Sequence, residues 1–402
     1  MKTMNFPYAS TRAGRSLTTA LCVAGLQLLL MAFPMGSLRA WGGNNDGNAF
    51  NWTNLQSDIP GVADRTDPNL VNSWGLAINP NADPRTGPFW VADNGTGVST
   101  VYEPDGTPFP VGTPLVVTIP PTPAQSSSPS APTGIVFNSV PSSLFPNAFK
   151  LSNGQRASFI FVGEDGRITA WNGGDGTTAE VKFDNSASGA VYKGLALAVR
   201  SNGGPTLYAT NFNSGHVDVF DSQFQPVTIP DSFVDNTAKP DLPMGAVGWA
   251  PFNIAAINGK IYVTFAAQNA EKHDDVAGPG TGFVDVFSTD GVFMGRLITG
   301  GNLNSPWGLA KVPDGTRFGK FYGNALFVGN FGDGFINAYD ISSGASLGQL
   351  QHRVNQPLQF NGLWALVFFN HHLYFTAGIA DEAHGLFGVI RPAGTHIEKE
   401  TD

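Results

Sequence analysis

Cysteine is almost absent from this chain of 402 residues, which contains one, at position 22. Because Cys22 falls in an N-terminal segment that we expect to be removed, the rest of the chain has no thiol for a disulfide or a cysteine-bound metal. The zinc patterns His-Glu-x-x-His and Cys-x-x-Cys are also missing, and no Gly-x-Ser-x-Gly segment is followed by a helical pattern. The fold must therefore depend on core packing, and no standard catalytic motif stands out.

Long apolar runs are scarce as well, and the exception lies at the N-terminus. Three basic residues precede an apolar stretch from Leu17 to Phe33, and the segment ends at Ala40 in MGSLRA. This order predicts a signal peptide over residues 1–40 and a secreted or periplasmic protein. A membrane anchor is the alternative, but the stretch is short for a span and is interrupted by polar residues.

Charged residues make up 13% of the chain, and their balance is acidic. The first 40 residues contain four cations and no acidic residue, so the remainder carries 18 cations and 31 anions, a net charge of −13. A chain with this charge repels nucleic acid and anionic lipid. We expect a monomer that binds a small molecule or a protein, without nucleic acid and without stable membrane insertion after cleavage.

The sequence contains a segment that recurs. LVNSWGLAINP (70–80) returns as LNSPWGLAKVP (303–313), and four related apolar segments lie between or after them. Aligned on positions 75, 134, 194, 253, 308 and 365, the six copies are 59, 60, 59, 55 and 57 residues apart. A constant spacing of this length indicates a repeated structural unit.

Each copy is followed by two further strand patterns, such as FWVADN (89–94) and then VSTVYEPDG, and usually by a weaker fourth. The 49 glycines and 29 prolines suit many short strands joined by tight turns. Four antiparallel strands per unit, repeated six times, predict an all-β, six-bladed β-propeller. A β-solenoid is the competing repeat architecture, but its repeats are usually much shorter.

The last unit lacks a fourth strand. FNWTNLQSDI (50–59), which precedes the first unit, can supply it and so close the ring. We therefore expect a flexible lead-in over 41–49, one propeller domain over 50–392 and a polar tail over 393–402.

The segments NLVNSWGLAINP, FWVADNGTG, LYATNFNSGHVDVFD and LFVGNFGDGFINAYD resemble a family of secreted bacterial six-bladed β-propellers of uncharacterised function. The similarity covers roughly residues 50 to 392. More distantly, the pattern is similar to NHL-repeat and gluconolactonase-type propellers. The resemblance implies the fold and export, and it brings no catalytic residues to transfer.

Polar residues gather in the loops that should surround one mouth of the central channel. Carboxylate and amide oxygens suit Ca²⁺, so one interpretation is a metal site near the axis. The other interpretation is ordinary turn chemistry. The metal candidates are Asp93, Glu164, Asn211 and Asn330.

Two loops combine histidine with carboxylates: DEAHG (381–385) and EKHDD (271–275). Asp381 could orient His384 as a base, with Glu382 beside it, but short acidic loops often contain a histidine without function.

Three tryptophans fall at nearly equivalent positions where first strands begin. They either stack a ligand at the channel mouth or fill the gaps between blades. The candidate ligand face comprises Trp74, Trp307, Trp364, Asn72 and Asn304.

We therefore expect a non-enzymatic secreted scaffold that binds a ligand or protein at this face. The alternative is a Ca²⁺-type metal-dependent hydrolase of lactones or esters at the same face. The fold alone does not choose between them.

Overall fold

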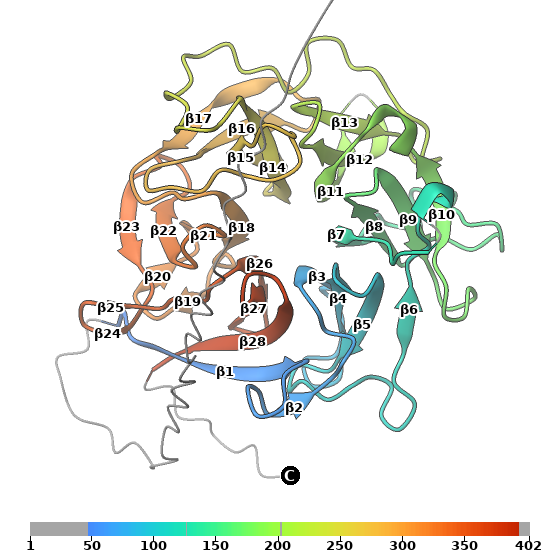
Figure 1. The fold of residues 1–402 in the computed structure, drawn as a ribbon, viewed down its shortest axis with the longest axis horizontal. Helices are drawn as coiled ribbons and strands as arrows, with labels where there is room; N and C mark the ends of the chain where they lie inside the picture. The colour runs from blue at the N-terminus through green and yellow to red at the C-terminus, as the bar shows by residue number, and fades with distance from the viewer. Residues whose placement is uncertain (1–46, 126, 202, 394–402) are drawn as a thin grey trace, which may run out of the picture. The chain divides into compact units, whose positions relative to one another are not determined.

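The computed structural model describes residues 47–125, 127–201 and 203–393. All of them belong to one compact unit, Asn44–Asp402. They form six antiparallel blades around a central axis (Figure 1). The helices among them are two 3₁₀ turns, η1 (Pro123–Gln125) and η2 (Ser186–Ser188). The predicted six-bladed β-propeller is confirmed.

Strand order in the chain is also the order from the axis outward, except in blade six. Blade one contains β3 (Ser73–Ile78), β4 (Phe89–Asp93), β5 (Val98–Tyr102) and β6 (Val116–Thr118). Blade two contains β7 (Pro132–Phe137), β8 (Phe159–Gly163), β9 (Arg167–Trp171) and β10 (Glu180–Asp184). Blade three contains β11 (Tyr192–Arg200), β12 (Gly204–Asn211) and β13 (His216–Phe220). Blades four and five contain β14 (Gly248–Ile257), β15 (Lys260–Gln268), β16 (Phe283–Ser288) and β17 (Phe293–Thr299); and β18 (Pro306–Lys311), β21 (Ala325–Asn330), β22 (Ile336–Asp340) and β23 (Ser346–Gln349). Blade six contains β26 (Leu363–Phe369), β27 (His372–Ile379), β28 (His384–Pro392) and β1 (Phe50–Ser57). Short pairings involve β2 (Arg65–Thr66), β19 (Arg317–Phe318), β20 (Phe321–Tyr322), β24 (Gln351–Arg353) and β25 (Gln356–Pro357).

Blade three is the least regular. Its sheet has three strands, and the place of a fourth is taken by an isolated bridge between Phe220 and Pro226. The next strand begins only at Gly248, after a long connection.

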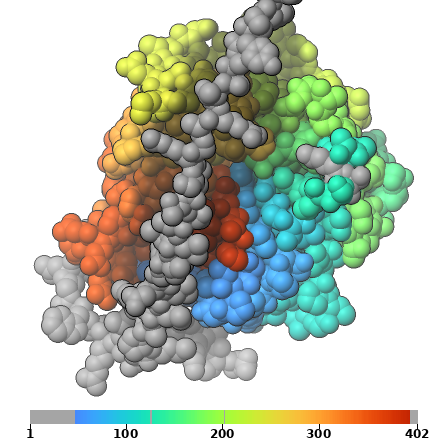
Figure 2. Space-filling model, in the orientation of Figure 1, coloured from blue at the N-terminus to red at the C-terminus, as the bar shows by residue number. Residues whose placement is uncertain are grey.

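The ring closes as expected from the sequence. Strand β1 pairs antiparallel with β28, from Phe50 opposite Pro392 to Ser57 opposite Leu386 (Figure 1). The two ends of the described chain accordingly meet, and Ala393 N donates a hydrogen bond to the Ala49 carbonyl oxygen at 2.7 Å. Figure 2 shows early (blue) and late (red) parts of the chain side by side on one face. The predicted signal peptide, most of the lead-in and nearly all of the polar tail lie outside the described residues.

A hydrophobic cluster fills the space between each pair of neighbouring blades among the described residues. Between blades one and two, for example, Trp90 packs on Phe159 and Trp171, with ring centroids 4.3 and 4.6 Å apart. Neighbouring blades cover both faces of a middle strand such as β4, so all five of its residues are buried. This two-sided burial explains why second strands read as continuous apolar runs.

Every inner strand has a β-bulge at the same place in the repeat. In blade one, Trp74 and Gly75 oppose a single residue of β4, between the pairs Ser73–Asp93 and Leu76–Val91. A Cβ on Gly75 would lie 2.3 Å from the Thr133 carbonyl oxygen of blade two, so the bulge requires glycine there. A bulge redirects side chains. The six residues that begin the bulges, which we call the hub residues, are Trp74, Thr133, Lys193, Phe252, Trp307 and Trp364.

Candidate functional site

The three tryptophans among the hub residues pack against one another. Trp74 and Trp364 stack with centroids 3.5 Å apart, and Trp307 meets them edge-on at 6.2 and 5.7 Å. Their exposed fractions are 3%, 1% and 4%, respectively. They form a wall inside the ring, and their expected role in filling the gaps between blades stays a prediction. A ligand stacked on this wall stays a prediction.

Lys193 is the charged hub residue. Its side chain is 2% exposed, and its Nζ lies 5.0 Å from the centre of the Trp74 ring. The ammonium forms an ion pair with Glu164 and a second one, at 3.5 Å, with Asp274. Burial alone would lower the pKa of Lys193, but Glu164 and then Asp274 raise it above its ordinary value. Lys193 is therefore a buried, charged group at the centre of the ring.

A chain of hydrogen bonds links Glu164 to the tryptophan wall. Asn94 donates from Nδ2 to Glu164 Oε2 at 3.0 Å, and Asn72 Nδ2 donates to Asn94 Oδ1 at 3.3 Å. Trp364 Nε1 in turn donates to Asn72 Oδ1 at 3.4 Å. Three of the predicted residues, Glu164, Asn72 and Trp364, thus lie in one network with Lys193.

The long connection between β15 and β16 brings His273 and Asp274 to Lys193. The loop folds back on its strand through a hydrogen bond from Val276 N to the Ala267 carbonyl oxygen, at 2.8 Å. Asn304, a predicted ligand-face residue, accepts a hydrogen bond from Gly278 N at 2.7 Å and so anchors the same loop. Asp274 Oδ1 lies 2.9 Å from His273 Nδ1, and this contact lowers the pKa of Asp274 to about 2 and raises that of His273.

Glu382 comes to this network from blade six. Ala380, Asp381 and Glu382 are three successive residues with φ of 54°, 54° and 64°, a left-handed conformation that is strained for residues other than glycine. Glu382 Oε1 is buried and has no hydrogen-bond partner among the described residues. Burial, with a further contribution from Glu164, raises the pKa of Glu382 to about 7, against the effect of Asn72. A carboxyl group with this pKa can give or take a proton near neutral pH.

We call Glu164, Lys193, His273, Asp274 and Glu382 the polar mouth. They come from blades two, three, four and six, so only the closed ring brings them together. Lys193 is the functional candidate that sequence reasoning missed. The signal was available, because the repeat alignment puts this lysine at the position that holds tryptophan in three other copies.

Three polar-mouth residues have metal-ligand chemistry. Glu164, His273 and Asp274 each offer one ligand atom, and these atoms lie within 4.8 Å of one another. A mixed oxygen and nitrogen set suits a transition metal better than Ca²⁺, which prefers oxygen alone. The Lys193 ammonium already pairs with two of the three groups and would compete with any cation.

The other proposed Ca²⁺ ligands bond within their own blades. Asp93 is fully buried and accepts a hydrogen bond from Thr100 N at 2.9 Å. Asn211 donates to Asp218 at 3.0 Å, and Asn330 donates to Asp333 at 3.0 Å. Of the four candidates, only Glu164 joins the polar mouth, and a Ca²⁺ ion held by all four stays a prediction.

His384 has a different partner from the one that the sequence suggested. Its Nδ1 lies 2.6 Å from Asp58 Oδ2, just beyond β1, and Asp58 Oδ1 accepts a hydrogen bond from Gly385 N at 2.9 Å. Asp381, the expected partner, is exposed. The His384–Asp58 contact thus joins the two strands that close the ring.

Comparison with known proteins identifies sequence relatives of the chain. No family model matches it. Two uncharacterized proteins of Acanthamoeba polyphaga mimivirus do: one is 30% identical over 344 residues, covering 84% of this chain and 78% of the viral protein. The other is 30% identical over 339 residues, covering 81% and 82%. The chain belongs to the family of these viral proteins. The bacterial origin that the resemblance implied is not supported by these relatives.

One solved structure of low sequence identity agrees with this fold. A protein of unknown function from Bacteroides thetaiotaomicron has a TM-score of 0.50 and 12% identity, over 85% of this chain and 76% of the other. A glucose dehydrogenase has a TM-score of 0.49 and 12% identity, over 84% and 99%. At such low identity the likeness extends to the propeller fold and no further. In the described part of the chain, no helix has the length and hydropathy to cross a membrane.

Proposed function

We propose that this chain is an exported, non-enzymatic scaffold that binds a ligand at the polar mouth. The observation that carries the proposal is the buried ion pair of Lys193 with Glu164, together with Glu382 Oε1, which has no hydrogen-bond partner in the described part of the chain. Buried ion pairs add little stability, and apolar residues of similar size often do as well. The other hub residues are uncharged, so a charge at this one position is better explained by recognition than by packing.

The balance of charges suggests the class of ligand. Three carboxyl groups meet one lysine and one histidine at the polar mouth, and the unpartnered atom of Glu382 is an acceptor. A ligand that brings donors would satisfy it. We therefore favour a small molecule rich in amino or hydroxyl groups, bound beside the half-exposed His273 and the exposed Asp274.

Isothermal titration of the purified full chain with glucosamine, sorbitol and spermidine tests this class of ligand. We expect binding of at least one compound with a Kd below about 1 mM, weakened about tenfold or more in Glu382→Gln. Asp381→Asn is the matched control, since it removes an exposed carboxylate one residue away and should leave the Kd unchanged. Absence of heat with all three compounds would contradict the ligand class.

A second candidate is a metal-dependent hydrolase of lactones or esters. It is favoured by the raised pKa of Glu382, about 7, next to the possible metal ligands Glu164, His273 and Asp274. Turnover of δ-valerolactone and p-nitrophenyl acetate, measured after EDTA treatment and after return of Ca²⁺ or Zn²⁺, distinguishes the two. Metal-dependent turnover that is lost in Glu382→Gln would favour the hydrolase over the non-enzymatic scaffold.

Export is proposed from the N-terminal sequence alone, as cleavage of residues 1–40. Intact-mass measurement of protein recovered from the periplasm or culture medium tests it. The expected product begins close to Trp41, and a product that retains the N-terminal methionine would contradict cleavage.

A further inference from the structure

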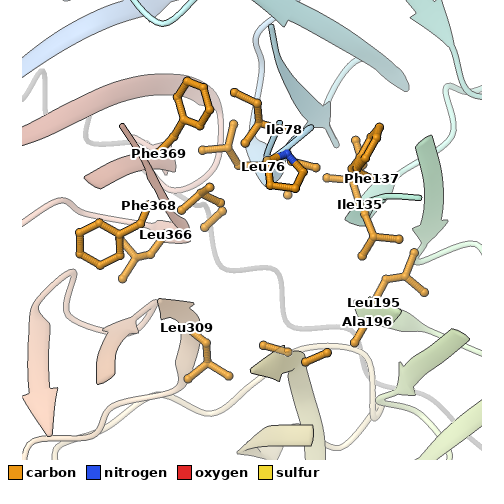
Figure 3. Close-up of a pocket in the computed structure, with 18 of the residues that line it drawn as sticks. Leu76, Ile78, Ile135, Phe137, Leu195, Ala196, Leu309, Leu366, Phe368 and Phe369 are labelled. Atoms are coloured by element: carbon orange, nitrogen blue, oxygen red, sulfur yellow. The ribbon is translucent and has the colours of Figure 1, made fainter. Parts of the chain in front are cut away.

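A second candidate site lies at the other end of the same channel. Each inner strand begins beside the polar mouth, passes the hub and continues toward this end. In blade one, Asn72 belongs to the polar network, Trp74 to the wall, and Ile78 to the lining of a cavity of about 760 Å³. Figure 3 shows the labelled lining side chains arranged around the open centre.

The lining of this cavity is mostly apolar and includes residues of all six inner strands. Among its lining residues there is no acidic residue, lysine, arginine or histidine. Each inner strand provides at least one branched aliphatic side chain: Ile78, Ile135, Leu195, Ile254, Leu309 and Leu366. Phe137, Phe368 and Phe369 add aromatic surface, and Figure 3 shows them around the same opening.

A polar group of the hub borders the cavity, in addition to the polar lining residues Ser139, Asn253 and Asn370. Trp307 borders the cavity, and its Nε1–H is buried without a hydrogen-bond partner among the described residues. A buried donor without a partner is destabilising, and a bound acceptor would relieve this. The tryptophan wall, of which Trp307 is part, lies between this cavity and the polar mouth.

We propose that this cavity binds a neutral, apolar small molecule that presents one hydrogen-bond acceptor to Trp307. The volume falls within the range of about 300–1,000 Å³ that is usual for small-molecule sites. An ionised ligand would lose its hydration and find no countercharge in the lining. The site is separate from the polar mouth, so it does not depend on the function proposed there.

Two rigid aromatic probes of nearly the same shape test the acceptor. Fluorenone has a carbonyl oxygen and fluorene has none, and both can be titrated as competitors of Nile red, a neutral dye whose fluorescence rises in apolar sites. We expect fluorenone to bind up to about tenfold more tightly than fluorene, the ratio that one net hydrogen bond supplies. In Trp307→Phe this ratio should fall to about one, because fluorenone loses the donor that fluorene never uses.

A charged variant at the rim tests the location. Ala256 lines the cavity and is itself exposed, so Ala256→Arg adds a charge to the cavity without emptying the core. We expect Nile red affinity to fall at least tenfold. Val292→Arg is the control: Val292 is 62% exposed in the β16–β17 turn of the same blade, away from the lining. Glu382→Gln should leave Nile red binding unchanged, which separates this site from the polar mouth.

Several outcomes would overturn the proposal. If Nile red fluorescence does not rise with the native protein, the cavity does not bind an apolar molecule. If Ala256→Arg binds Nile red with wild-type affinity, the dye binds outside the cavity. Equal affinities of the native protein for fluorenone and fluorene remove the acceptor. Sedimentation that shows self-association blocked by Ala256→Arg, without dye binding, would assign the cavity to a second copy of the chain.

Discussion

The two ends of the channel are built on the same six strands, but they differ in charge, burial and origin of their side chains. At the apolar end, Ile78, Leu195 and Leu309 belong to inner strands. At the polar end, Glu164 and Glu382 come from loops between strands. Loops can vary without disturbing the blades that carry them. A single ring can thus offer two unrelated sites, and variants that affect one end should leave the other intact.

The largest loss of stability is expected for a variant in the tryptophan wall, which lies between the two ends of the channel. Trp364→Ala removes an indole that stacks on both Trp74 and Phe331, at 3.5 and 4.0 Å. We expect the free energy of unfolding to fall by about 3–5 kcal/mol, as for other buried tryptophans, in chemical denaturation. Trp52→Ala, which removes a side chain that is 42% exposed, should have a much smaller effect. Similar losses for both variants would mean that the wall is not central to packing.

Lys193→Met should give the next largest effect. It leaves Glu164, whose side chain is 13% exposed, without its ammonium partner. Removal of one member of a buried pair is destabilising by about 3–5 kcal/mol, and partial exposure of Glu164 puts the expected loss near the lower limit. The double variant Lys193→Met, Glu164→Gln should recover most of it, since no unpaired charge remains. A double variant as unstable as the single one would show that Lys193 acts through packing on Trp74.

The fold was predictable because the six copies repeat a pattern that each blade needs for the same physical reason. Second strands are apolar throughout because both faces are covered, as in β4. The closing role of residues 50–57 followed from the missing outer strand in blade six. The bulges were not predicted, although the glycine that recurs inside the inner strand in four of the six copies, at positions 75, 134, 194 and 308, is a signal for one.

The site was predictable only in part. Glu164 and Asn72 were identified because they lie in the expected loops, but Asp93 and Asn330 end strands β4 and β21 and bond within their own blades. Side-chain direction at the end of a strand depends on hydrogen bonds that sequence alone does not reveal. Likewise, the partner of His384 is Asp58, which is 326 residues away in the chain.

Glu382 should make stability depend on pH at the polar end. Its pKa rises from 4.5 to about 7 on folding, so the folded chain holds this proton more tightly than the unfolded chain. The free energy of unfolding therefore falls as pH rises from about 4.5 to 7, and outside that window this group adds no pH dependence.

In Glu382→Gln this contribution should disappear. We expect the variant to be more stable than the wild type by about 1–2 kcal/mol above pH 7, after allowance for the partial exposure of the side chain to water. Urea denaturation from pH 4 to 8 measures the difference. Asp381→Asn, at an exposed position, should follow the wild-type profile, and parallel profiles for Glu382→Gln and wild type would contradict the assignment.

The smallest change in stability is expected for His384→Asn. This variant also tests whether the histidine belongs to the polar mouth. Its side chain is 41% exposed, and its partner Asp58 is held independently by Gly385 N. A half-exposed pair of this kind contributes at most about 1 kcal/mol, so the urea midpoint should hardly move. Asp58→Ala should be more damaging, because it also removes the acceptor that fastens the end of β1 to β28. Polar ligand affinity should be unchanged in His384→Asn, because no contact links this histidine to Lys193 or Glu164 among the described residues. A tenfold loss of affinity would instead extend the polar mouth across blade six to the seam where the ring closes.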